Sequence, residues 1–222
     1  MIEKFFPNVD WELMWEATKE TIYMTAASTF YTFIFGLILG IVLFLTSPGQ
    51  LWANRTFNFI TGTFVNVFRS IPFLILIILL IPFTKLIMES MRGPQAALPA
   101  LVIGSAPFYA RMVLIGLQEI NKGVIEAARS MGAKTSTIIF KVLIPESLPA
   151  LISGITVTAI ALVGYTAMAG VIGAGGLGNL AYLDGFQRNR GDVTLAATIL
   201  ILIIVFIIQF IGDLAVKKID KR

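Results

Sequence analysis

The side chains that most often carry catalytic or metal chemistry are missing from this sequence. Its 222 residues include no Cys and no His. A disulfide framework, a thiolate nucleophile and a Cys metal site are therefore excluded, and the commonest metal ligand and general base are absent. A membrane-embedded enzyme would need acids inside its apolar stretches. The first four such stretches contain none, and Asp213 lies at the end of the fifth. The composition therefore disfavours an enzyme.

A glycine-rich run at Gly173–Gly178 has the spacing G-x-G-x-x-G. In a dinucleotide-binding fold this spacing follows a strand, opens a helix and precedes a conserved acid. Here it follows a long apolar stretch, so a nucleotide site is disfavoured. Glycine permits close approach of backbones and unusual torsions. We interpret the run as a turn on the outer side of a membrane, either part of an external gate or purely structural.

Arg69 lies about 12 residues into an apolar stretch, or ~18 Å at the rise of a helix. A charge at that depth in a bilayer is costly and usually faces protein or water. Its guanidinium could contact the carboxylate of a substrate, or it could contact helix carbonyls or a partner acid within the protein. The second interpretation is favoured, because almost no strong acceptor is visible nearby in the sequence.

The elements that carry these residues are membrane helices by composition. Hydrophobic residues make up 57% of the chain and charged residues 14%, against roughly a quarter charged in ordinary globular chains. A spanning helix needs about 20 apolar residues. Stretches of this kind occupy residues 23–46, 57–83, 95–117, 147–169 and 193–211. The predicted fold is therefore a single all-α membrane domain, residues 1–222, with five transmembrane helices.

The basic residues of the loops predict the orientation of the chain. One side carries nine of them: Arg55, Lys122, Arg129, Lys134, Lys141, Lys217, Lys218, Lys221 and Arg222. The other side carries six, diluted by acids: Lys4, Lys19, Lys85, Arg92, Arg188 and Arg190. The richer side is expected to be cytoplasmic. With five spans, this places the N-terminus outside and the C-terminus inside.

Residues 1–20 do not resemble a signal peptide, because they are acidic and lack a basic start. Residues 10–20 have the composition of a short helix that carries Trp11 and Trp15. Paired tryptophans are typical of helices at the membrane–water interface. We therefore expect a short interfacial helix before the first span.

The segment 118–146, between the third and fourth spans, is long for a loop and is expected to be functional. Asn121 can cap a helix that starts near Val124, and Gly132 can end it in the left-handed conformation. A second amphipathic helix is predicted from Thr135 or Ser136, and Pro145 is expected to stop it. Ser147 and Pro149 would then start the fourth span.

Within this segment, the Ala127-Ala128 pair adds little bulk, so another protein could approach the backbone closely. Glu126 and Arg129 lie three residues apart on one helix face. An ordinary loop helix packed on the membrane domain is the alternative interpretation, and the residues alone do not separate the two.

A family resemblance separates them. Glu126-Ala127-Ala128, followed by Gly132 and by residues 142–145, resembles the E-A-A, G and I-x-L-P signature of ABC importer permeases, with Val142 in place of Ile and Ile144 in place of Leu. The resemblance implies the type I architecture with a cytoplasmic coupling helix that docks in a groove of the ATPase subunit. The implied ATPase-coupling residues are Glu126, Ala127, Ala128, Arg129, Met131, Gly132 and Pro145.

Residues 69–73, 106–112, 164–168 and 173–178 resemble the methionine importers within this family, and the resemblance covers almost the whole chain. Related importers of other amino acids or small solutes share parts of these motifs and are the alternative. Candidate residues of a translocation path or gate are Arg69, Ser70, Tyr165, Met168, Gly175 and Gly176. An ion channel formed by the chain alone is a third hypothesis.

The resemblance also implies partners: a second copy of the chain, two ABC ATPase subunits, an extracytoplasmic substrate-binding (lipo)protein and the lipid bilayer of the cytoplasmic membrane. No nucleic-acid partner is expected, because the net charge of +4 is small and spread out. No G-x-x-x-x-G-K-[ST] motif occurs in the sequence, so the chain lacks an ATP site of that type. We therefore expect it to bind no cofactor, and the partner ATPase to use ATP and Mg. The implied mechanism is alternating access.

Overall fold

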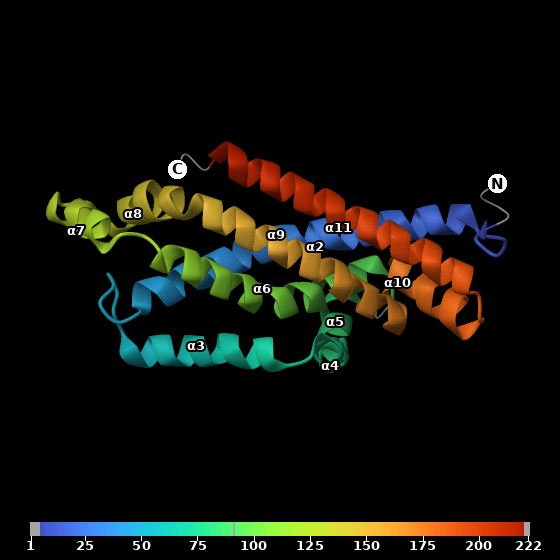
Figure 1. Cartoon of the computed structure of the whole chain (residues 1–222). Helices are drawn as coiled ribbons and strands as arrows, with labels where there is room; N and C mark the ends of the chain where they lie inside the picture. Colours follow the sequence, from blue (N-terminus) through green and yellow to red (C-terminus); the bar gives the residue numbers. More distant parts are fainter. Residues whose placement is uncertain (1–4, 91, 220–222) are drawn as a thin grey trace.

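The computed structural model describes residues 5–90 and 92–219, and these residues are almost entirely helical (Figure 1). No strand occurs in this described part, so the predicted all-α fold is confirmed there. Lys4, Lys221 and Arg222, which contribute to the predicted orientation, lie outside the described residues, as do residues 1–3 of the N-terminal segment 1–20 in which the interfacial helix is expected.

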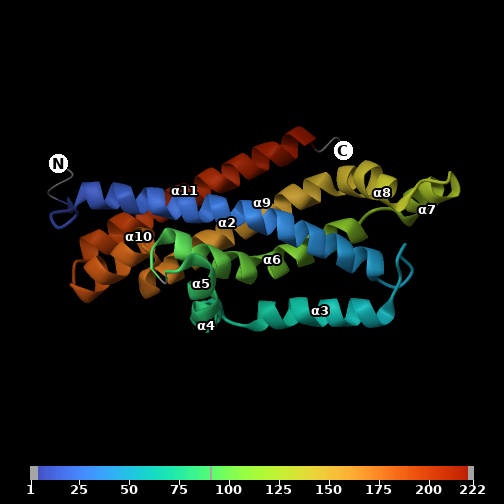
Figure 2. The same cartoon turned by 180° about the vertical axis from the view of Figure 1, so that it is seen from behind.

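Among the described residues, four helices are long and apolar enough to cross a bilayer. They are α2 (Trp11–Thr46), α6 (Pro94–Gln118), a continuous helix over Thr135–Ala174, and α11 (Gly191–Ile219). The continuous helix consists of α8 (Thr135–Ile138), the π-helical segment η1 (Ile139–Leu143), α9 (Ile144–Ala169) and the π-helical segment η2 (Gly170–Ala174). It is kinked near its end at Gly173, whose φ of 100° and ψ of 17° are not helical. These helices lie alongside one another as an elongated bundle (Figure 1, Figure 2).

The second predicted span, residues 57–83, is broken, and the expectation of one helix there is wrong. Helix α3 (Arg55–Ser70) ends at Ile71, whose φ of −78° and ψ of 123° are extended. Helix α4 (Phe73–Leu79) then leaves at 105° to α3. Pro72 is the cause, because proline disfavours helical torsions at the residue before it. Taken as one broken span, α3 and α4 bring the possible crossings to five.

A third short helix follows α4 before the chain returns to the bundle. Helix α5 (Ile81–Met88) carries a proline in its first turn, where the missing N–H is not needed. It ends at Glu89, whose φ of 56° is left-handed. Together α4 and α5 lie beside α6, and α3 runs along the outside of the bundle (Figure 1).

The short interfacial helix expected before the first span is not a separate element. Helix α2 starts at Trp11 and continues for 36 residues without a break. Asp10 caps its start, since its Oδ1 accepts the N–H groups of Glu12 at 3.0 Å and Leu13 at 3.1 Å. The expected boundary near residue 20 is wrong because no Pro or Gly interrupts the backbone hydrogen bonds there.

Two glycines allow α2 and α6 to pack with their backbones close together. Gly36 and Gly40 are four residues apart and so lie on the same face of α2. A Cβ atom on Gly36 would lie 2.9 Å from the Ala106 carbonyl oxygen, and one on Gly40 would lie 2.7 Å from that of Ala110. Small residues at this spacing are a common device for packing membrane helices.

The two ends of the bundle differ in what they carry. Helix α7 (Lys122–Ser130), α8 and the end of α11 lie at one end, which we call the α7 end (Figure 1, Figure 2). The start of α2 and helix α10 (Gly176–Leu180) lie at the other, the α10 end. At the α10 end, Asn8 donates its backbone N–H to Asp192 at 2.8 Å and thereby links the start of the chain to α11.

Candidate functional site

The segment after α6 forms the predicted helix and turn. The Asn121 side chain accepts the N–H of Gly123 at 2.8 Å and caps α7, which starts at Lys122 rather than near Val124. Gly132 has a φ of 79°. Its N–H bonds the Arg129 carbonyl at 2.9 Å, and the Ala133 N–H bonds that of Ala128 at 3.1 Å. These two bonds form a Schellman motif, in which glycine is the favoured residue.

The two faces of α7 have different surroundings. Ile125 and Ala128 are buried, with Ala128 only 7% exposed, and pack into the apolar core at the α7 end. Glu126, Ala127 and Arg129 are exposed. The expectation that both alanines offer a small docking face is therefore wrong for Ala128. The helix packs on the membrane domain by one face and leaves the other open.

Apolar side chains extend the open surface beyond α7. Met131 is 82% exposed, directly before the Gly132 turn, and Phe140 in η1 is 70% exposed. Met131 is among the residues predicted from the sequence, whereas Phe140 is not. One feature of the sequence indicates that Phe140 is exposed: it lies outside the apolar stripe of the second predicted helix. The residues of such a stripe pack against the core, and residues outside it face away. We call Glu126, Ala127, Arg129, Met131 and Phe140 the docking surface.

Pro145 does not stop the second helix, and that expectation is wrong. Ile144 is helical, with φ −64° and ψ −49°, and the chain continues from η1 into α9. Proline lacks the N–H that an α-helix needs. Pro145 is tolerated here because it lies in the first turn after η1, where the π-helical hydrogen bonds reach five residues back instead of four. Ser147 does not cap α9 either, because its hydroxyl donates to the Leu143 carbonyl at 2.7 Å inside the continuous helix.

The break between α3 and α4 lies beside a small pocket of about 260 Å³. Its walls come from four helices, and it is lined by Phe68, Arg69, Ile71, Phe73, Leu76, Gly104, Phe108 and Tyr165. The guanidinium carbon of Arg69 lies 5.9 Å from the centre of the Phe108 ring. The Phe73 and Tyr165 rings stack with their centres 4.3 Å apart. We call this the Arg69 pocket.

Of the other residues predicted for a translocation path, Tyr165 lines the Arg69 pocket, whereas Ser70 and Met168 do not. The structure brings Arg69 and Tyr165 together from positions far apart in the sequence. Ser70 is exposed, and its hydroxyl donates to the Asn66 carbonyl at 2.8 Å. Met168 is exposed on α9 and does not line this pocket.

The glycines at the α10 end form a turn held by an acid from α2. Gly173, Gly175 and Gly176 have φ values of 100°, 83° and 78°. The Gly176 N–H donates to Oε2 of Glu20 at 2.6 Å, and the Leu177 N–H donates to the Thr21 hydroxyl oxygen at 2.9 Å. Sequence reasoning predicted the turn but missed Glu20, because 156 residues separate it from Gly176.

Glu20→Ala is expected to loosen the glycine turn, because the first N–H of α10 loses its acceptor. Loss of a capping side chain typically costs ~0.5–2 kcal/mol. Hydrogen exchange should therefore quicken at Gly176 and Leu177 in the purified protein. Glu16→Ala is the matched control: it removes an exposed ion pair with Lys19, which contributes little. Equal exchange rates in the two variants would contradict the role of Glu20.

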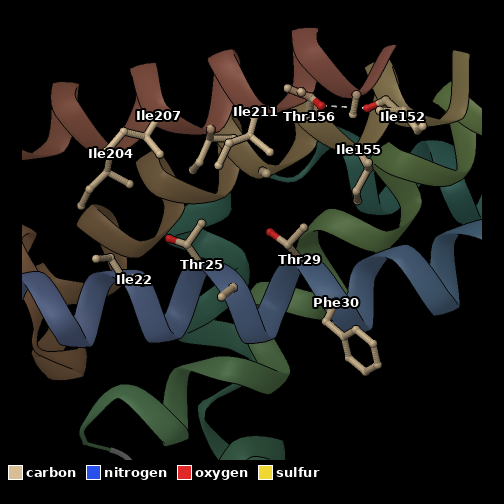
Figure 3. Close-up of a pocket in the computed structure, with 15 residues that line it drawn as sticks. Ile22, Thr25, Thr29, Phe30, Ile152, Ile155, Thr156, Ile204, Ile207 and Ile211 are labelled. Carbon is tan, nitrogen blue, oxygen red and sulfur yellow. Dashed lines mark hydrogen bonds between the residues drawn. The ribbon is translucent and has the colours of Figure 1, made fainter. Parts of the chain in front are cut away.

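A second cavity contains none of the predicted site residues. It has a volume of about 550 Å³ and lies between α2, α9 and α11 (Figure 3). Its walls are mainly isoleucines such as Ile204 and Ile207, with Thr25 and Thr29 on α2. Within the described part of the chain, neither threonine hydroxyl has a hydrogen-bond partner. The cavity offers no charged group to a ligand.

The sequence matches a family of transport proteins and several of its members. Residues 33–222 match the family described as binding-protein-dependent transport system inner membrane component. The methionine import system permease protein MetP of Bacillus subtilis (strain 168) is 68% identical over 222 residues, which are 100% of both chains. The probable D-methionine transport system permease protein MetI of Pasteurella multocida (strain Pm70) is 44% identical over 212 residues, 96% of this chain and 98% of that one.

The fold also matches that of a solved transporter. A chain of the MetNI methionine ABC transporter in an inward-facing conformation superposes with a TM-score of 0.94 and is 44% identical. The match covers 95% of this chain and 98% of that one.

Proposed function

The chain belongs to the binding-protein-dependent transport system inner membrane components, and we propose that it is the permease subunit of an ATP-driven ABC importer that carries methionine across the cytoplasmic membrane. The observation that carries the proposal is the full-length identity to the Bacillus subtilis methionine import permease. Membership confirms the predicted architecture, an all-α permease of the type I ABC importers.

The docking surface is the contact with the ATPase subunit in this proposal. It is supported by the position of α7 at one end of the bundle and by the exposure of Glu126, Ala127, Arg129 and Met131. The ATPase binds ATP and Mg and hydrolyses the nucleotide. Its closure moves the docking surface, and the continuous helix after Gly132 carries the movement toward the α10 end.

The complete transporter in this proposal contains two copies of the chain, two ATPase subunits and a substrate-binding lipoprotein. The exposed apolar side chains of α3 support a cover of lipid or of the second copy, since Phe57, Phe59, Ile60 and Phe64 all face outward from the chain. The substrate-binding protein delivers methionine at the α10 end, opposite the ATPase. Closing and reopening of the ATPase pair expose the path to the two sides in turn.

We place the α7 end in the cytoplasm and the start of α2 outside. Support comes from the basic residues and from the position of the start of α2 and the end of α11 toward opposite ends of the bundle (Figure 2). Lys134→Cys, on the naturally Cys-free chain, should react with a membrane-impermeant maleimide only in opened cells. Arg190→Cys, exposed near the other end, should react in intact cells. The reverse pattern would overturn the orientation.

Uptake by a methionine auxotroph tests the substrate. In a strain without its own methionine importers, expression of the chain with its ATPase and binding protein should restore high-affinity uptake of labelled methionine. An excess of unlabelled leucine should leave that uptake unchanged. Restored uptake of another amino acid or small solute without methionine uptake would replace the proposal by its alternative.

A further inference from the structure

Arg69 lies near the end of α3, far along a segment that is apolar enough to enter the membrane, yet it is exposed. It is 14 residues from the start of α3 at Arg55, which is ~21 Å along the helix axis, and the hydrocarbon core of a bilayer is only ~30 Å thick. A charged side chain at that depth faces protein or water, because lipid would not solvate it. The exposed side of Arg69 therefore belongs to a polar space.

The Arg69 pocket has the size and walls for a small amphiphilic molecule. Pockets for drug-sized ligands measure ~300–1,000 Å³, so 260 Å³ suits a smaller molecule of amino-acid size. Aromatic rings form its apolar walls: Phe68, Phe73, Phe108 and Tyr165. Aromatic rings attract thioether sulfur atoms at their edges. An apolar, polarisable side chain fits these walls.

The same pocket contains groups of opposite polarity. The guanidinium of Arg69 has five N–H donors, and among the described residues it forms no ion pair and no hydrogen bond. The Phe68 carbonyl would normally accept the N–H four residues later, but residue 72 is a proline and has none. The Arg69 guanidinium and a carbonyl that lacks its usual i+4 helical donor therefore belong to the same end of α3.

The charge of Arg69 also has a purely structural explanation, and an experiment must distinguish it from recognition of a substrate. A cation in the last turn of a helix is stabilised by the helix dipole. That role requires only a positive charge, and Lys would supply it as well as Arg. Recognition of a carboxylate by two parallel hydrogen bonds requires the planar guanidinium, which Lys lacks.

We propose that the Arg69 pocket is a transit site for the transported α-amino acid. The Arg69 guanidinium pairs with the α-carboxylate, the carbonyl end of α3 accepts the ammonium group, and the rings of Phe73, Phe108 and Tyr165 contact the side chain. This inference rests on the proposed function, because the ligand it names is methionine. It assigns the substrate to a site at the break between α3 and α4.

Transport by the reconstituted complex tests the proposal. Proteoliposomes would contain the chain, its ATPase and its binding protein, and two rates would be measured: methionine uptake and stimulation of ATP hydrolysis by the loaded binding protein. Arg69→Met and Arg69→Lys should each lower uptake about tenfold or more, the effect of losing a hydrogen-bonded charge partner. ATPase stimulation should stay within about twofold, because the pocket lies away from the docking surface.

Arg55→Met is the matched control, because it removes an exposed arginine from the other end of the same helix. It should leave both rates unchanged. If the wild-type complex transports methionine, then full uptake by Arg69→Met or by Arg69→Lys would overturn the transit site. A wild-type complex that transports no methionine would instead overturn the proposed function.

Protection of a cysteine gives a second, direct measurement. Ile71 lines the pocket, and Ile71→Cys would be the only thiol of the permease. Methionine should slow its reaction with a thiol reagent, whereas methioninol, which lacks the carboxylate, should not. Adding Arg69→Met should remove the protection. Equal protection by methionine and methioninol would show that the guanidinium does not hold the carboxylate.

Discussion

Gly132→Val is expected to abolish methionine uptake while the chain still inserts into the membrane. Gly132 has a φ of 79° at the end of α7, and a β-branched residue in that region is strained by roughly 1–3 kcal/mol. Space is not the obstacle, because no atom lies within 4 Å of a Cβ built there. The strain would be relieved by moving α7, which misplaces the docking surface and weakens binding of the ATPase.

Two further variants separate the torsion from other effects of the substitution. Gly132→Asn should keep most of the uptake, since Asn tolerates the left-handed region far better than Val does. Gly62→Val, in α3, adds the same side chain at a glycine that also has open space but no positive φ. It should leave ATPase binding unchanged. If Gly132→Val binds the ATPase and transports at the wild-type rate, α7 is not the coupling element.

Gly178→Ala is expected to destabilise the whole α10 end. A Cβ atom on Gly178 would overlap the Ala167 backbone, with its carbonyl carbon only 2.7 Å away. Backbone atoms cannot change rotamer, so α10 must move off α9. Overpacking of this kind typically costs ~1–3 kcal/mol, and each kcal/mol lowers the midpoint of thermal unfolding by about 2–4 °C in chains of 150–250 residues. A loss of several degrees should follow, together with loss of uptake.

Gly164→Ala provides the comparison for Gly178→Ala. Gly164 lies in α9 with no atom within 4 Å of a built Cβ, and Ala has the higher helix propensity. Its thermal midpoint in detergent should equal or exceed that of the wild type. A Gly178→Ala protein with an unchanged midpoint would mean that α9 and α10 are not in backbone contact.

Apolar stretches predicted the existence of the long helices but not their ends or the break. Composition reports where lipid would lie, whereas a helix continues wherever its backbone hydrogen bonds continue. Helix α2 therefore starts at Trp11, 12 residues before the predicted span at residue 23. Pro72 ends α3, but the direction that α4 takes at 105° to it accompanies the burial of Phe73, Leu76 and Ile77, which no local pattern reveals.

The candidate site was predictable where its parts are neighbours in the sequence. The Asn121 cap and the Gly132 turn follow local rules and are confirmed. The exposed and buried faces of α7 required tertiary structure, because Ala127 and Ala128 are chemically identical and only packing distinguishes them. Glu20 and the Arg69 pocket were hidden for the same reason: their partners lie far away along the chain.

The continuous helix over Thr135–Ala174 has a mechanical consequence. Its regular part α9 alone has 26 residues and measures ~39 Å at 1.5 Å each, more than the thickness of the hydrocarbon core, ~30 Å. A glycine with positive φ lies at each end, Gly132 before it and Gly173 near its close. The element is therefore a long helix with a glycine at either end, where the backbone can change direction. In the proposed transporter, a movement of the docking surface would therefore be transmitted along this helix toward the glycine turn held by Glu20.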